Sequence, residues 1–297
     1  MPKIDQLSPA PSVMRKPRDD EIDVHGLTHI GKIRKQNQDH FLLASIHKRV
    51  DIHRTSLPDR ARLPFGDQRV AFFAMVADGV GGGEGGAEAS ATALENAMQY
   101  VVGSMDCYYR ADAGEDDFIN ALQRTALECH HAVLDRARSQ HVEGKMATTL
   151  TMWMAVWPRR YLLQVGDSRY YLWRDGALTQ VSRDQTIAQE LLDKGVFTRA
   201  DAARSGFANV LSSSIGGQQT EPVVTRLEGR WDDVNLICSD GLTKHVSDEQ
   251  IAQRLSTMTS SRQVCEQLLQ DALDGGGTDN ITIIVGRAIP KDLPVSL

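Results

Sequence analysis

AFFAMVADGVGGGEGGAEAS, residues 71–90, passes from an apolar run to a glycine-rich segment around one carboxylate. The apolar run, residues 71–77, predicts a buried strand. Asp78 ends that strand, and the glycines that follow let the backbone come close to a bound group before a helix begins. The junction therefore indicates a binding site for a metal, a phosphate or a dinucleotide.

The dinucleotide alternative rests on a formal G-x-G-x-x-G match at Gly81, Gly83 and Gly86. A dinucleotide fold needs a parallel strand directly after the first helix. Here residues 87–102 and 118–138 both have apolar side chains at helical spacing, so we expect two successive helices. The dinucleotide interpretation is therefore disfavoured, and a P-loop is excluded because no Gly-Lys-Ser/Thr follows.

The rest of the chain predicts many strands and few helices. Asp175-Gly176 is a two-residue hairpin signal between strands at 169–174 and 177–181, which we expect to be antiparallel neighbours. Residues 197–208 have weak patterning and are interpreted as a mobile flap. Further strands are expected at 148–157, 161–165, 210–213, 222–227 and 234–238, and helices at 186–194, 251–255 and 262–273.

Composition narrows the class of protein. The chain has 297 residues, 41% of them hydrophobic, and a formal net charge of −6, so we expect a globular protein that does not bind nucleic acid. Its four cysteines are widely separated, which is typical of a reducing cytoplasm. No apolar run is long enough for a membrane span or a signal peptide. We therefore predict a cytoplasmic monomer with no membrane partner.

The predicted organisation is one domain between two tails. Residues 1–21 contain prolines and scattered charge and are expected to form a disordered tail, residues 22–290 a single domain, and residues 291–297 a short tail. A basic loop insertion at about 45–69 joins two strands. We interpret this loop as a solvated hairpin insertion in preference to a docking surface.

Four carboxylates stand at expected strand ends: Asp78, Asp240 and Asp279 lie beside glycine or asparagine, and Asp39, after Asn37-Gln38, is a fourth acidic terminus. One such aspartate usually forms a turn. Four that converged would repel one another unless a cation lay among them, and oxygen ligands favour Mg²⁺ or Mn²⁺ over Zn²⁺.

Seven short motifs in order resemble the metal-dependent protein phosphatases of the PPM or PP2C type, in their bacterial form. The resemblance spans about residues 23–287. The motifs are Gly31-x-x-Arg34-x-x-Asn37-Gln38-Asp39, VADGVGGGEGGAEAS at 76–90, MATTL at 146–150, VGDSR at 165–169, SRDQT at 182–186, CSDGL at 238–242 and DNIT at 279–282.

This resemblance implies an α+β fold, a four-layer α/β/β/α sandwich of two antiparallel sheets flanked by antiparallel helix pairs. It also implies two Mn²⁺ or Mg²⁺ ions. Asp78 would bridge the ions, the Gly79 carbonyl would ligate one, and Asp240 and Asp279 would hold the other. Asp39 would lie close by as a ligand or water anchor.

The implied activity is hydrolysis of phosphoserine and phosphothreonine in proteins by a water that bridges the two ions. Arg34 would clamp the phosphoryl oxygens through its planar fork. The implied partners are phosphoproteins made by a serine/threonine kinase. The alternative function is a catalytically silent module that binds a partner through the basic loop and the flap.

Three further residues carry weaker expectations. Bacterial relatives often have an aspartate for a third metal just before the MATTL motif, where this chain offers only Glu143, so a third ion is not favoured. Asp167 and Asp184 lie in family-like motifs, and we interpret both as structural hydrogen-bond acceptors.

Overall fold

The computed structural model describes residues 15–59, 66–80, 84–104 and 114–291. Two sheets form its centre, and every pair of named strands in them is antiparallel. The first sheet has the order β1 (Ile22–His29), β11 (Ile281–Ala288), β10 (Val234–Cys238), β7 (Arg169–Arg174), β8 (Ala177–Gln180). The second has the order β2 (Asp39–Val50), β3 (Gly66–Val80), β5 (Leu150–Val156), β6 (Arg159–Val165), β9 (Val223–Glu228), and the short β4 (Ala147–Thr148) pairs with β3.

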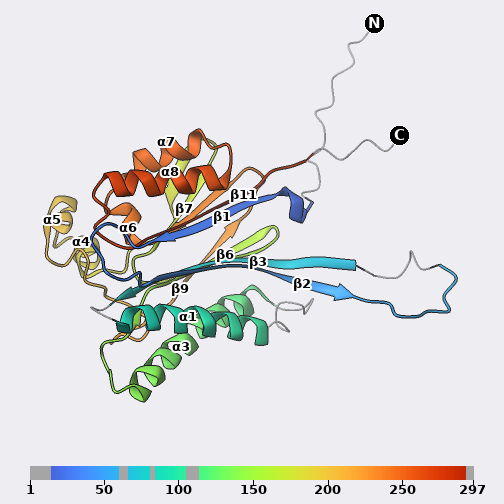
Figure 1. The fold of residues 1–297 in the computed structure, drawn as a ribbon, viewed down its shortest axis with the longest axis horizontal. Helices are drawn as coiled ribbons and strands as arrows, with labels where there is room; N and C mark the ends of the chain where they lie inside the picture. The colour runs from blue at the N-terminus through green and yellow to red at the C-terminus, as the bar shows by residue number, and fades with distance from the viewer. Residues whose placement is uncertain (1–14, 60–65, 81–83, 105–113, 292–297) are drawn as a thin grey trace, which may run out of the picture.

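Helix pairs cover the outer faces of both sheets. In Figure 1, α7 (Asp248–Ser256) and α8 (Ser261–Asp274) lie over the first sheet, while α1 (Glu84–Gly103) and α3 (Glu115–Ser139) lie over the second. Three short helices lie near one end of the sandwich: α4 (Ile187–Asp193), α5 (Arg199–Arg204) and α6 (Asp240–Thr243). The predicted four-layer sandwich is confirmed, and within the described residues no helix is both long and apolar enough to span a membrane.

Three apolar clusters hold the layers together. One joins α1 and α3 to the second sheet, and the fully buried Ala89, Ala93 and Ala97 let α1 approach that sheet closely. A second cluster joins the first sheet to α6, α7 and α8. The third lies between the two sheets and includes Val76, Ile237 and Ile284. Both faces of the central strands are therefore buried, which explains why their sequences are continuous apolar runs.

The N-terminal segment is ordered earlier than the sequence predicts. Arg15 donates to both carboxylate oxygens of the buried Glu21, at 2.6 and 2.5 Å, and Arg69 donates to the Pro17 carbonyl at 2.5 Å. At the other end of the chain, the Lys291 amide donates to Glu21 Oε1 at 3.0 Å. The predicted tail is therefore wrong for residues 15–21, because these ion pairs and hydrogen bonds supply contacts that composition does not reveal. Residues 1–14 and 292–297 lie outside the described residues.

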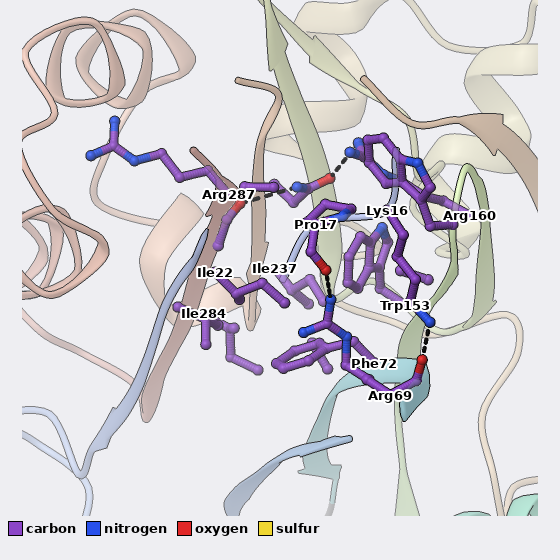
Figure 2. Close-up of a pocket in the computed structure, with 17 residues that line it drawn as sticks. Lys16, Pro17, Ile22, Arg69, Phe72, Trp153, Arg160, Ile237, Ile284 and Arg287 are labelled. Atoms are coloured by element: carbon purple, nitrogen blue, oxygen red, sulfur yellow. Dashed lines mark hydrogen bonds between the residues drawn. The ribbon is translucent and has the colours of Figure 1, made fainter. Parts of the chain in front are cut away.

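This segment lies against a cavity between the sheets. Lys16 and Pro17 line it together with apolar side chains such as Phe72, Trp153 and Ile237 (Figure 2). Its volume is about 80 Å³.

The basic loop is shorter than predicted. Strands β2 and β3 stay paired as far as Val50 and Gly66, with one register shift after Ile46. They form a ribbon that projects from the body of the molecule (Figure 1). The loop bounds of 45–69 are therefore wrong at both ends, and residues 60–65 lie outside the described part. The strand expected at 210–213 is also wrong, since only Leu211 forms an isolated bridge, to Thr186.

Candidate metal centre

Four aspartates from both sheets meet at one end of the sandwich. Asp39 and Asp78 are register partners in β2 and β3 of the second sheet. Asp240 follows β10 and Asp279 precedes β11, and these strands are neighbours in the first sheet. Arg34, Asp78, Gly79, Asp240 and Asp279 line a pocket of about 270 Å³, while Asp39, beside Asp78 on the neighbouring strand, is not among the lining residues.

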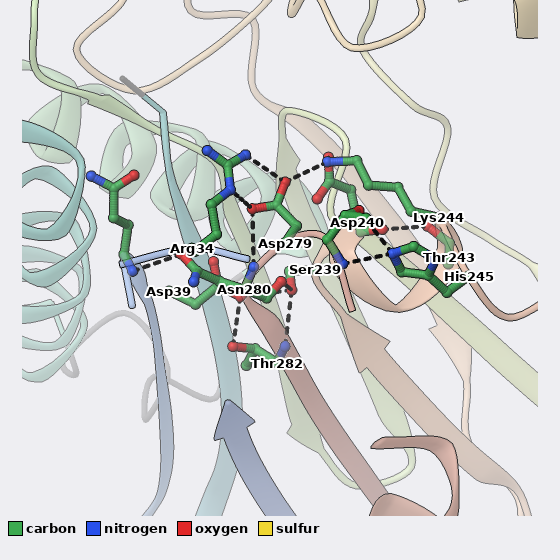
Figure 3. Close-up of polar contacts among 12 residues, drawn as sticks. Arg34, Asp39, Ser239, Asp240, Thr243, Lys244, His245, Asp279, Asn280 and Thr282 are labelled. Atoms are coloured by element: carbon green, nitrogen blue, oxygen red, sulfur yellow. Dashed lines mark hydrogen bonds and ion pairs between the residues drawn. The ribbon is translucent and has the colours of Figure 1, made fainter. Parts of the chain in front are cut away.

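Asp39 is the most enclosed of these carboxylates. It is 2% exposed, and its Oδ2 accepts hydrogen bonds from Ser239 Oγ at 2.7 Å and Thr282 Oγ1 at 2.8 Å (Figure 3). Its Oδ1 is buried and accepts no hydrogen bond from the described residues. Burial raises the pKa of Asp39 to about 6, against the lowering effect of those two hydroxyl donors. Two hydrogen bonds thus hold one carboxylate oxygen of Asp39 in place, while the other oxygen has no hydrogen-bond donor among the described residues.

Asp78 and Gly79 form the end of β3. Burial, together with the charges of Asp39 and Asp240, raises the pKa of Asp78 well above its usual value. A Cβ on Gly79 would lie 2.2 Å from the carbonyl oxygen of Gly86 in α1. Glycine is required here because the first turn of α1 packs directly on the strand end.

Asp240 and Asp279 form ion pairs with basic side chains of the protein. Lys244 Nζ lies 2.5 Å from Asp240 Oδ2 and 2.7 Å from Asp279 Oδ2. Arg34 Nε lies 2.7 Å from Asp279 Oδ1, and a terminal nitrogen of the same guanidinium donates to Oδ2 at 2.9 Å (Figure 3). Although burial opposes the effect, hydrogen bonds from Arg34 and Lys244 lower the pKa of Asp279.

The chemistry of these residues fits a divalent cation. The buried Oδ1 atoms of Asp39 and Asp240 both lack a hydrogen-bond donor among the described residues. A buried carboxylate oxygen without a partner is costly, and a hard cation would satisfy it. Within the described ranges, however, no three His, Cys, Asp or Glu side chains are already grouped as a ligand set. Asp240 and Asp279 are instead turned toward Lys244 and Arg34.

Three residues have roles at this site that were not predicted from the sequence. Asp167 was interpreted as structural, but it lines the pocket, and burial with the nearby charge of Asp240 raises its pKa to about 7. Lys244 is four residues after Asp240 on α6, a spacing that could have indicated the ion pair. Asn280 ties the loop before β2 to the pocket, because its amide donates to the carbonyls of Ile30 and Gln36 at 2.9 and 3.0 Å.

Two other expectations concern residues near the pocket. Asp184 is structural as predicted, since it accepts hydrogen bonds from Arg169 Nε at 2.9 Å and from a terminal nitrogen at 2.7 Å. Glu143 is exposed in the turn before β4 and is absent from the described residues that line the pocket. Asn209 and Leu211 line the pocket wall one and three residues beyond the predicted end of the flap, and no residue of 197–208 is among the described residues that line it.

Comparison with known proteins identifies the family. The family model described as protein phosphatase 2C matches residues 56–275. The serine/threonine protein phosphatase PstP of Mycobacterium tuberculosis is 33% identical over 217 residues, which are 73% of this chain and 40% of PstP. The chain thus spans less than half the length of that relative. The serine/threonine phosphatase stp of Listeria innocua is 27% identical and is matched over 71% of this chain and 82% of its own length.

A solved structure agrees in fold. The catalytic domain of PstP in complex with two manganese ions is similar with a TM-score of 0.69 and 28% identity, covering 91% of this chain and 99% of that domain. The family-model match and the PstP identity each cover more than two thirds of the chain. This chain therefore belongs to the protein phosphatase 2C family.

Proposed function

We propose that the chain is a metal-dependent phosphatase that hydrolyses phosphoserine and phosphothreonine in proteins, by direct attack of a water that two Mn²⁺ or Mg²⁺ ions activate. The observation that carries this proposal is the convergence of four strand-end aspartates, two with buried oxygens that lack donors, beside an arginine. The names of the relatives and the manganese in the PstP structure support it.

The residues that would hold the ions come from both sheets. Asp78 would lie between the two ions, the Gly79 carbonyl would ligate one, and Asp240 and Asp279 the other. Asp39, beside Asp78 on the neighbouring strand, would act as a ligand or water anchor. When bound, such a pair of ions supplies a water acidic enough to lose its proton near neutral pH.

Arg34 would bind the phosphoryl group. Its side chain is 51% exposed at the pocket and its guanidinium is planar, so it can turn from Asp279 toward two phosphoryl oxygens at once. In the net reaction the oxygen of a water would form a bond to phosphorus as the bond to the serine or threonine oxygen breaks, and a proton from that water would end on the leaving oxygen. The products are inorganic phosphate and the free hydroxyl, and no side chain of the enzyme becomes phosphorylated.

The proposed substrates are phosphoproteins made by a serine/threonine kinase, and we keep the prediction of a monomer. A second candidate is the catalytically silent module that binds a partner through the β2–β3 ribbon and the flap. One observation favours it: Asp240 and Asp279 already hold Lys244 and Arg34.

Phosphate release from a phosphothreonine peptide separates the two candidates. The phosphatase proposal expects turnover that needs Mn²⁺ or Mg²⁺, stops with a chelator and is lost in Asp240→Asn. Absence of turnover over a range of Mn²⁺ concentrations, with normal folding by circular dichroism, would contradict the proposal and leave the silent module. Unchanged turnover in Asp240→Asn would refute the assignment of that ligand.

A further inference from the structure

Lys244 is placed where a metal ion would be expected. Its ammonium contacts Asp240 at 2.5 Å and Asp279 at 2.7 Å, and these are two of the proposed ligands of one ion (Figure 3). Its side chain is only 26% exposed, so both ion pairs are partly shielded from water. Two carboxylates from separate strands thus share one lysine.

Asp279 offers no vacant oxygen in this arrangement. Its Oδ1 accepts from Arg34 and from the amide of Asn280, and its Oδ2 accepts from Arg34 and Lys244. Asp240 has one oxygen on Lys244 and the other buried without a donor. An ion that used both carboxylates would therefore have to displace the ammonium, because two cations cannot share these oxygens without strong repulsion.

Arg34 and Lys244 differ in how easily their charges can move away from the carboxylates when an ion binds. The guanidinium of Arg34 is a rigid fork, whereas Lys244 carries a point charge on a flexible four-carbon chain. Lys244 also directly follows the last residue of α6, four residues after Asp240. Rotation about its side-chain bonds is therefore enough to move its charge away from the carboxylates. The lysine can leave without movement of the backbone.

We propose that Lys244 is a tethered competitor of the metal: it neutralises Asp240 and Asp279 in the metal-free protein and is expelled when the ion binds. This proposal rests on the proposed two-metal function. Its consequence is a lowered affinity for one of the two ions, so that Lys244 sets the metal concentration at which the site is filled. A purely structural ion pair, by contrast, would affect folding and leave metal affinity unchanged.

Calorimetric titration with Mn²⁺ tests the proposal on the full chain, comparing wild type with Lys244→Met. Because Lys244→Met removes charge-assisted hydrogen bonds that an ion must displace, we expect the weaker Mn²⁺ site to become about tenfold tighter, or more, which corresponds to about 1.4 kcal/mol. Lys244→Arg, which keeps the charge, should stay close to wild type. Lys48→Met is the matched control, because Lys48 is exposed on β2 and its loss should leave both affinities unchanged.

A second measurement uses the wild-type protein alone. Acetylation of lysine amines, followed by mass spectrometry, should modify Lys244 faster when Mn²⁺ is bound, because the amine has then left its carboxylates. This readout holds even if Lys244→Met does not fold.

The possible results separate the two proposals. If wild type binds two Mn²⁺ ions and Lys244→Met binds them no tighter, the role of Lys244 is refuted and the proposed function stands. If neither protein binds Mn²⁺, both are refuted. Binding by Lys244→Met alone would support the competitor role in its strongest form. A rate of Lys244 acetylation that does not rise with Mn²⁺ would overturn it.

Discussion

Replacing Asp39 by asparagine should stabilise the metal-free protein. Asp39 is 2% exposed, and burial raises its pKa from 3.8 to about 6. The folded state therefore keeps a proton that the unfolded chain releases as the pH rises above about 4. Stability of the metal-free wild type should fall from about pH 4 to about pH 6, and the full penalty should persist above that window.

The size of the effect follows from the shift. Each pKa unit corresponds to about 1.4 kcal/mol, so a shift of about two units corresponds to about 3 kcal/mol at pH 7. Asparagine mimics the neutral acid: its carbonyl oxygen can keep the hydrogen bonds from Ser239 and Thr282, and its amide can face Asp78. Asp39→Asn should thus be more stable than wild type at pH 7 by about this amount, and equal to it near pH 4.

Urea unfolding in the presence of a chelator, repeated from pH 4 to pH 8, measures this difference. Asp51→Asn, which removes an exposed carboxylate at the start of the loop after β2, is the control and should leave the pH dependence nearly unchanged. A gain in stability that is the same at every pH, or a loss at pH 7, would show that burial of the Asp39 carboxylate does not destabilise the metal-free protein. With Mn²⁺ present the order should reverse, because the ion stabilises the native aspartate.

Three further predictions concern other parts of the molecule. Arg34→Lys should lower kcat/KM for a phosphothreonine peptide by about ten- to a hundredfold, because one charge-assisted hydrogen bond is lost, while Arg54→Lys in the exposed hairpin should not change it. Gly79→Ala should lower the free energy of unfolding by about 1–3 kcal/mol and weaken Mn²⁺ binding in calorimetry, whereas Gly103→Ala, where a Cβ meets nothing within 4 Å, should do neither. Glu21→Gln should lower the melting temperature at pH 7 with Mn²⁺ affinity intact. Because hydrogen bonds from Arg15 lower the Glu21 pKa, this difference should shrink as the pH falls below about 4.5, and a constant difference would contradict the role of its charge.

The fold was predictable because its signals are local and periodic. Continuous apolar runs such as Val234–Cys238, the two consecutive helical patterns and the Asp175-Gly176 turn are each visible in a short window. The four aspartates were also identifiable, since each stands at one end of an apolar run and three of them lie beside glycine or asparagine. What failed depends on contacts between distant segments, such as the packing of residues 15–21 on Arg69.

The site shows the same limit. Asp167 lies in a family-like motif and Lys244 stands four residues after Asp240, but only the folded arrangement shows that both line the pocket with Asp240. The pairing of Asp279 with two cations is likewise invisible in the sequence, because Arg34 lies 245 residues away from it. The sequence therefore points to the four aspartates, whereas the basic side chains that pair with two of them are evident only in the folded structure.

The contact between Lys291 and Glu21 indicates where another protein or a solid support can be attached to this domain. It brings the two ends of the described chain together at the end of the sandwich away from the pocket (Figure 1). β1 alone, with eight residues, carries the chain about 26 Å toward the pocket. A module or a solid support attached at residue 15 or residue 291 would therefore lie at the opposite end of the sandwich and leave the aspartate-lined pocket accessible to a bulky phosphoprotein.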